Sequence, residues 1–157
     1  MLVLLEGANG VGKTTLINKL KQSYAFKVYK EPRHLIKNIK DLLHWRETTG
    51  KWLLERWKNK IVLLDRYHIS TLIYNVILNK ELSYSEYLQH YQKIVKPDLI
   101  IVLTAPLDII LTRRPNLDKN TAKRLLRLYS LYVHASDKAR LFSNSDDAFR
   151  FISSCVF

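Results

Sequence analysis

The sequence predicts an α/β fold in which a parallel sheet of five strands has helices on both faces. Two observations predict this class. Short apolar runs alternate along the chain with segments whose apolar residues recur at helical spacing, which is typical of strands joined by helical crossovers. A glycine-rich turn ending in lysine and threonine lies directly between the first apolar run and the first helical segment. The expected architecture therefore has three layers, with a polar crevice where the strands end.

Five segments are short and mostly apolar, and we expect each to form a strand. They are residues 2–5, 26–29, 61–64, 99–103 and 140–143. No repeat, linker or low-complexity tract interrupts the alternation. The 157 residues are thus expected to form a single domain, 1–157.

Three signals locate helices between and after the later strands. Ser83 followed by Glu86 is a capping box, and apolar residues recur at helical spacing behind it. Thr121 is the expected N-cap of a second helix, which keeps Leu125 and Leu128 on one face. Residues 143–147 are expected to form the turn before a short final helix.

The composition favours an anionic ligand. The chain carries 26 Lys and Arg against 14 Asp and Glu, a formal net charge of +12. Such an excess suits nucleotide phosphates or nucleic acid, so a basic nucleic-acid-binding protein is one alternative. Cys155, the single cysteine, cannot form an internal disulfide, and no apolar run is long enough to cross a bilayer. We expect a cytoplasmic protein that does not associate with membranes.

The glycine-rich turn satisfies the pattern G-x-x-x-x-G-K-[ST] of a P-loop through Gly7, Gly12, Lys13 and Thr14. Glycines let successive backbone N–H groups point inward, and the helix N-terminus adds positive potential. Lys13 would neutralise the β and γ phosphates of ATP, and Thr14 would ligate Mg²⁺. The residues expected to hold the nucleotide are Gly7, Ala8, Asn9, Gly10, Val11, Gly12, Lys13, Thr14 and Thr15.

A carboxylate ends the third predicted strand. Asp65 would open onto the same crevice as the P-loop, where it could hold magnesium or its water. The GTPase specificity motif N-K-x-D is missing, because Asn59 and Lys60 are followed by Ile61 and Val62. The pattern favours a kinase, whose anionic acceptor needs no base to activate it.

Four stretches of the sequence resemble the thymidylate kinase family. Residues 5–15 resemble its P-loop, Glu31 and Pro32 its E-P motif, and residues 97–103 its P-D-L strand. The most specific stretch matches D-R-Y-x-x-S-x-x-x-Y, with Asp65, Arg66, Tyr67, Ser70 and Tyr74. The resemblance implies the P-loop NTPase fold with sheet order 2-3-1-4-5. It also implies ATP and Mg²⁺ as cofactors, deoxythymidine monophosphate (dTMP) as acceptor, and a homodimer.

The resemblance also assigns roles to residues. Arg46, nineteen residues before Asp65, is close to where the family has an arginine that grips the acceptor phosphate. A short lid is expected at about residues 113–123, with Arg113 and Arg114 as the catalytic arginines beside Lys13 and Arg66, since Gly10 takes the P-loop position that carries an arginine in other members. The residues expected to bind the acceptor are Asn9, Glu31, Arg46, Arg66, Tyr67, Ser70 and Tyr74.

Two departures from the family pattern and two alternative interpretations stay open. The family usually has Asp or Glu at the position of Asn9 and often Gln at that of Asn75, so the preferred sugar or acceptor could differ. Tyr67 and Tyr74 could pack in the core instead of lining a base pocket. Glu31 could be the general base of a deoxynucleoside kinase, although that family ends its third strand with an E-R-S-like sequence.

Overall fold

The structure, a computed structural model, describes residues 1–22, 26–31, 36–78 and 82–155. Pro32 of the E-P motif lies outside these residues. Within the described chain, a five-stranded parallel sheet has the order β2-β3-β1-β4-β5, as the resemblance implied. The strands are β1 (Leu2–Glu6), β2 (Phe26–Lys30), β3 (Ile61–Asp65), β4 (Leu99–Leu103) and β5 (Ala139–Phe142). All five predicted strands are confirmed, with ends that shift by at most one residue.

The central strands are apolar because both faces of the sheet are covered. In β1, Leu4 pairs with Leu64 of β3 on one side and with Ile100 of β4 on the other. Leu4 and Leu64 have no exposed surface, and Ile100 is almost as buried. This explains why the strands appear in the sequence as continuous apolar runs and not as alternating ones.

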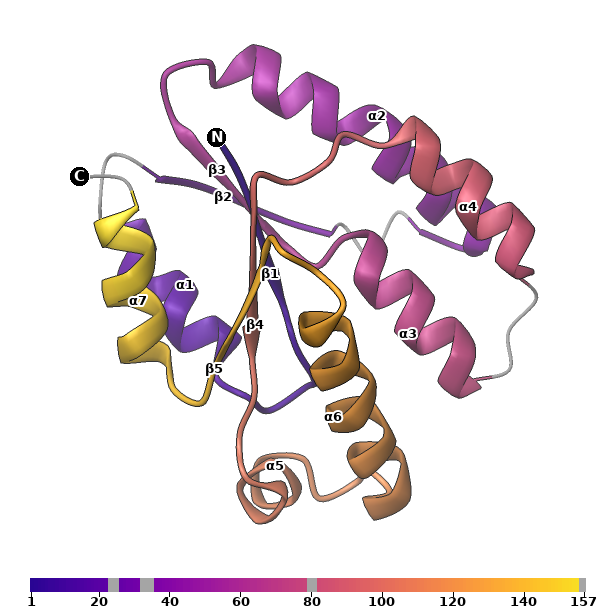
Figure 1. Cartoon of the computed structure of the whole chain (residues 1–157), viewed down its shortest axis with the longest axis vertical. Coiled ribbons are helices and arrows are strands. Elements are labelled where there is room, and N and C mark those ends of the chain that lie inside the picture. Colours follow the sequence, from indigo (N-terminus) through magenta and orange to yellow (C-terminus); the bar gives the residue numbers. More distant parts are fainter. Residues whose placement is uncertain (23–25, 32–35, 79–81, 156–157) are drawn as a thin grey trace.

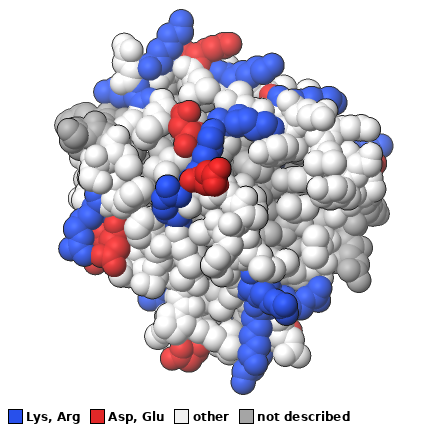
Figure 2. Space-filling view, in the orientation of Figure 1, with Lys and Arg blue, Asp and Glu red and all other residues white. Residues whose placement is uncertain are grey.

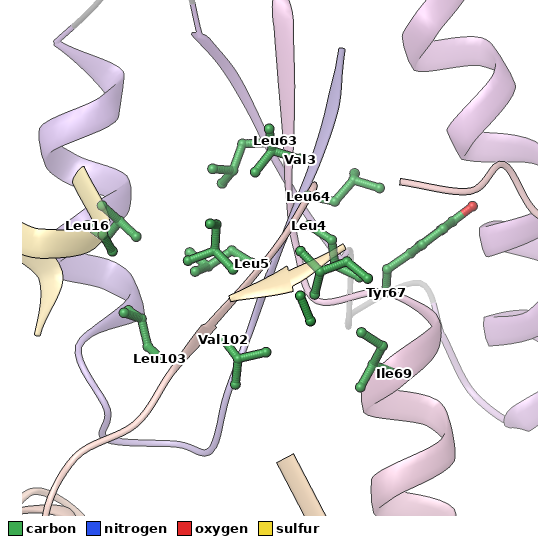
Figure 3. Close-up of a cluster of buried hydrophobic side chains, with 14 of the residues drawn as sticks. Val3, Leu4, Leu5, Leu16, Leu63, Leu64, Tyr67, Ile69, Val102 and Leu103 are labelled. Atoms are coloured by element: carbon green, nitrogen blue, oxygen red, sulfur yellow. The ribbon is translucent and has the colours of Figure 1, made fainter. Parts of the chain in front are cut away.

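Helices form the two outer layers (Figure 1). One face is covered by α1 (Lys13–Lys21) and α7 (Ser145–Ser154), and the other by α3 (His68–Leu78) and α6 (Lys119–His134). Beside the second layer lie α2 (Ile39–Arg56) and α4 (Tyr84–Lys93), which contact each other, and α5 (Leu107–Arg113) follows β4. Figure 3 shows Leu16 of α1 and Ile69 of α3 on opposite sides of the central strands.

The helix N-termini confirm one predicted cap and correct another. Ser83 and Glu86 form both hydrogen bonds of a capping box at the start of α4. Thr121 is not an N-cap, because α6 begins two residues earlier and the Asp118 carboxylate accepts the Thr121 backbone N–H at 2.7 Å. Aspartate caps as well as threonine does, so the pattern alone misplaced the boundary. The final helix is capped by Asn144.

The parallel topology brings the carboxyl ends of β1, β3 and β4 to one edge of the sheet. The loops that follow these strands carry the P-loop, the Asp65–Arg66–Tyr67 sequence and the connection to α5. Open parallel sheets bind ligands in the crevice at this edge. Among the described helices, none is long and apolar enough to cross a membrane.

Candidate active site

The P-loop passes tightly around the end of β4. Gly7 has φ 131°, and a Cβ there would lie 2.3 Å from the carbonyl oxygen of Leu103. Only glycine fits this position, since both the conformation and the space exclude a side chain. The loop then delivers the chain to α1, whose first residue is Lys13.

Lys13 is folded back over the loop that carries it. Its Nζ donates to the carbonyl oxygens of Gly7 at 2.7 Å and Ala8 at 2.8 Å. The side chain is largely buried, with 9% of the residue exposed. Lys13 must exchange these carbonyl contacts for phosphate oxygens if it is to bind a nucleotide.

A cavity of about 730 Å³ opens in front of the P-loop. Its walls combine the loop, the ends of β2 and β3, and the end of α5. The lining residues are Asn9, Gly10, Gly12, Lys13, Thr14, Thr15, Lys30, Glu31, Asp65, Arg66, Arg113 and Arg114. Of the predicted nucleotide-binding residues, Gly7, Ala8 and Val11 do not line it, and the side chains of Ala8 and Val11 are buried against the core.

Two of the lining residues fit a magnesium ion. Asp65 Oδ1 is buried, and no hydrogen-bond partner for it lies in the part of the chain that the structure describes. Thr14, at the start of α1, lines the same cavity. One carboxylate and one hydroxyl, completed by phosphates and water, is a donor set that Mg²⁺ uses.

Arg66 has a strained backbone conformation, and hydrogen bonds hold its side chain. It has φ 73°, the left-handed region that non-glycine residues rarely adopt, and it is 5% exposed. Its guanidinium donates to Asn9 Oδ1 at 2.8 Å and to Ser70 Oγ at 2.9 Å. Burial disfavours its charge, yet Tyr129 and the surrounding acidic groups raise its pKa above the ordinary value. Arg66 therefore presents a fixed positive charge beside the P-loop.

A buried carboxylate that sequence reasoning missed organises this region. Glu6, the last residue of β1, is 0% exposed and accepts the backbone N–H of Tyr67 at 2.9 Å and the hydroxyl of Ser70 at 2.5 Å. Tyr129 of α6 donates to it at 3.2 Å. Glu6 thus links the start of the P-loop to the segment that carries Arg66. The only sequence signal was an acidic residue closing an apolar strand.

Arg46 is buried on α2 and forms an ion pair with Glu31. Its NH2 group lies 2.5 Å from Glu31 Oε2, and the residue is 1% exposed. Burial lowers the pKa of Arg46, and the Glu31 carboxylate opposes that effect. Its Nε and NH1 groups are buried without a partner among the described residues. Buried unsatisfied donors are costly, so these two N–H groups are suited to donate hydrogen bonds to an anionic ligand.

A second cavity of about 310 Å³ adjoins the first, because Asn9, Glu31 and Arg66 line both. Its walls come from the P-loop, α2 and α3. The other lining residues are Ile39, Leu42, Arg46, Ser70, Thr71, Tyr74 and Asn75.

Some polar groups of this second cavity are hydrogen-bonded within the protein, and others have no partner among the described residues. The Asn75 amide is used by the backbone of Leu82, at 2.7 Å and 3.3 Å. The hydroxyls of Thr71 and Tyr74 are buried with no partner among the described residues. The guanidinium of Arg66 lies 5.3 Å from the centre of the Tyr74 ring. Sequence reasoning missed Thr71, although it is three residues before Tyr74 and so on the same helix face.

Tyr67 requires a correction. It lines neither cavity and is 0% exposed, so it is not placed to contact an acceptor directly. Its hydroxyl donates to the backbone carbonyl of Arg46 at 2.6 Å, and burial raises its pKa to about 12. The D-R-Y pattern cannot distinguish a pocket tyrosine from a core tyrosine, since both are amphipathic side chains at the same position.

The segment predicted as a lid is a helix–turn–helix. Residues 114–118 connect α5 to α6, and the Arg113 guanidinium donates to the carbonyl oxygen of Gly10 in the P-loop at 2.8 Å. Arg113 and Arg114 are exposed and line the first cavity, whereas Lys119, Lys123 and Arg124 do not. Figure 2 shows lysines and arginines gathered at this end of the molecule.

Two proteins with similar sequences are named as thymidylate kinases. The probable thymidylate kinase 1 of Saccharolobus solfataricus is 29% identical over 136 residues, which cover 73% of this chain and 70% of that protein. The probable thymidylate kinase of Sulfurisphaera tokodaii is 30% identical over 122 residues, covering 64% of this chain and 62% of that protein. No protein-family model matches the chain.

Solved structures share the fold. The YorR protein of Bacillus subtilis, in complex with phosphorylated GDP, superimposes with a TM-score of 0.72 at 19% identity, covering 99% of this chain and 95% of that one. The thymidylate kinase of Ehrlichia chaffeensis gives a TM-score of 0.71 at 16% identity, with 100% and 98% covered.

The fold is that of P-loop nucleotide kinases. Together with relatives named as thymidylate kinases, it indicates a phosphotransferase of the nucleotide kinase class. The resemblance to the thymidylate kinase family, predicted from the motifs, is confirmed by these relatives.

Proposed function

We propose that this chain transfers the γ-phosphate of ATP to a deoxynucleoside monophosphate, with dTMP as the favoured acceptor. The observation that carries the proposal is the common wall of the two cavities. Asn9, Glu31 and Arg66 face both, so a donor in the larger cavity and an acceptor in the smaller one would meet beside Arg66. The names of the relatives support dTMP in particular.

The donor would bind along the P-loop. Backbone N–H groups at the start of α1 and the ammonium group of Lys13 would surround the β and γ phosphates. Mg²⁺ held by Thr14 and Asp65 would neutralise the phosphate oxygens and orient them. Arg113 and Arg114, which already lie against the loop, would complete the donor site from the lid.

The acceptor would place its phosphate between Arg46 and Arg66. Both guanidinium groups are buried, and Arg46 has two unpaired donors among the described residues. Two polyanions repel each other, so fixed positive charges at their meeting point lower the barrier to in-line transfer. Ser70, Tyr74 and the Thr71 hydroxyl would surround the nucleoside.

Asn9 is the residue where this site departs from the family pattern. Its Oδ1 accepts a hydrogen bond from Arg66, so the neutral amide orients the arginine without neutralising it. An acceptor sugar would meet the remaining amide group at this position.

The deoxynucleoside kinase alternative is not favoured. In that reaction Glu31 would have to remove a proton from a sugar hydroxyl. Here its carboxylate is already engaged by the buried guanidinium of Arg46, at 2.5 Å, and is not directed at a sugar hydroxyl alone. The nucleic-acid-binding alternative has no support among the comparisons. We further propose a cytoplasmic homodimer, by analogy with the family.

An ATP-dependent screen over all ribose and deoxyribose monophosphates, with thymidine in parallel, tests the proposal. We expect the highest kcat/KM with dTMP and none with thymidine. Turnover of thymidine without turnover of any monophosphate would contradict it.

A further inference from the structure

We infer that Tyr67 is a positioning residue that fixes Arg46 relative to Arg66 and the P-loop by bonding to the backbone of α2. The inference deepens the proposed function, because it rests on Arg46 and Arg66 binding the acceptor phosphate. It concerns a residue whose side chain lines neither cavity.

A hydrogen bond from Tyr67 joins the two segments that carry Arg46 and Arg66. Arg46 and Arg66 come from different elements, α2 and the loop after β3, so some other contact must set their separation. Tyr67 directly follows Arg66, and its hydroxyl donates to the Arg46 carbonyl oxygen at 2.6 Å. Figure 3 shows the Tyr67 side chain extending away from the central strands, with its oxygen at the far end.

A glycine in α2 leaves the space in which this contact forms. Gly50 lies one turn after Arg46 on the same helix face, in the middle of α2. Glycine is among the least favourable residues in a helix interior. A Cβ at Gly50 would lie 2.8 Å from the Tyr67 hydroxyl and 3.2 Å from Val95 Cβ. The missing side chain therefore provides the notch through which the hydroxyl reaches the helix backbone.

The main chain of Tyr67 connects this contact to the donor side. The backbone N–H of Tyr67 donates to Glu6 Oε1 at 2.9 Å, and Glu6 immediately precedes Gly7 of the P-loop. One residue thus bonds through its main chain to the P-loop end of β1 and through its side chain to the helix that carries Arg46. Displacement of α2 would move Arg46 while leaving the P-loop in place.

Tyr67→Phe removes the hydroxyl and keeps the ring. We expect the Kd and KM for dTMP to rise about tenfold, the effect of losing one buried hydrogen bond on a group that must be precisely placed, with the Kd for ATP within about twofold of wild type. Tyr132→Phe, on α6 and outside both cavities, is the matched control and should leave both constants unchanged. Equal weakening of ATP and dTMP, or no weakening of either, would overturn the inference.

Gly50→Ala approaches the same contact from the helix. It should also weaken dTMP binding, and adding Tyr67→Phe should cost less than the sum of the single effects, because the new methyl group no longer meets a hydroxyl. Strict additivity would overturn the inference. If wild type binds and phosphorylates dTMP while Tyr67→Phe does so equally well, the inference alone fails. If wild type binds no nucleoside monophosphate in calorimetry, the inference and the proposed function fail together.

Discussion

The cavity proposed for the acceptor, the second one described above, and the larger cavity proposed for the donor are built on different physical principles. Arg46 and Arg66, on the acceptor side, are 1% and 5% exposed and are held by Glu31, Asn9 and Ser70. On the donor side Arg113 and Arg114 are exposed, and Lys13 is bonded to its own loop. The acceptor site is thus preorganised, while the donor site must rearrange. Ordering before binding reduces the entropic cost of capturing a small ligand, so selectivity should reside on the acceptor side.

Lys13→Ala should produce the largest effect on catalysis, and the effect should be confined to the donor side. It removes the mobile charge at the transferred phosphate, so kcat should fall by about 10³-fold. Because Lys13 does not line the acceptor cavity, the Kd for dTMP should stay within about twofold of wild type. Steady-state kinetics and calorimetry check both values. Parallel loss of dTMP binding would show that the two sides are not separate.

Arg66→Ala should affect both sides, since Arg66 lines both cavities. We expect kcat to fall by about 10²–10³-fold with the fold intact, because the lost contact strengthens as charge develops. Arg66→Lys keeps the charge without the planar fork and should be intermediate. Circular dichroism controls for folding, and an unchanged rate in Arg66→Ala would refute its role.

Glu31→Gln should test how much the acceptor side depends on its buried ion pair. Removing one partner of such a pair leaves an uncompensated charge and costs about 3 kcal/mol of stability. A bound phosphate would restore a negative partner for Arg46. Thermal unfolding should therefore show a larger stabilisation by dTMP in Glu31→Gln than in wild type. Equal stabilisation of the two proteins would argue against Arg46 as a phosphate ligand.

Acid should weaken the fold through His68, the first residue of α3. Burial lowers the pKa of His68 to about 3, and the charges of Arg46 and Lys96 act in the same direction. The unfolded chain binds a proton at about pH 6.5, so stability is lost as pH falls from 6.5 towards 3. Between pH 7 and pH 5 the loss should be about 2 kcal/mol.

Urea unfolding at the two pH values measures this effect. His68→Phe should reduce the difference between them, while His44→Gln, at an exposed histidine of α2, should not. An unchanged pH dependence in His68→Phe would contradict the assignment.

The sequence predicted the parts of the fold that depend on local pattern. Residues 2–5 and 99–103 are continuous apolar runs because they become central strands, and the spacing from Gly7 to Lys13 has few other uses. The motif predicted the residues around Arg66, but it did not predict which of them line a cavity and which lie in the core. Tyr67 was expected at the acceptor and is instead bonded to α2, which depends on Gly50, seventeen residues earlier in the chain.

Three other features could not be predicted from the local sequence. Glu6 looks like an acidic residue that ends a strand, and its importance comes from burial against Ser70 and Tyr129. The left-handed conformation of Arg66 is imposed by tertiary packing, since arginine has no preference for it. Thr71 gains its candidate role only because α3 places it in the wall of the second cavity, where its buried hydroxyl has no partner among the described residues.

The central claim is that the donor and the acceptor occupy one crevice face to face. A ligand in which adenosine and thymidine are joined through a chain of phosphates tests it most directly. If the two cavities meet beside Arg66, calorimetry should show this ligand binding about 10²-fold or more tighter than ATP or dTMP alone, with both Lys13→Ala and Arg66→Ala weakening it. Affinity no greater than that of ATP alone would contradict the account.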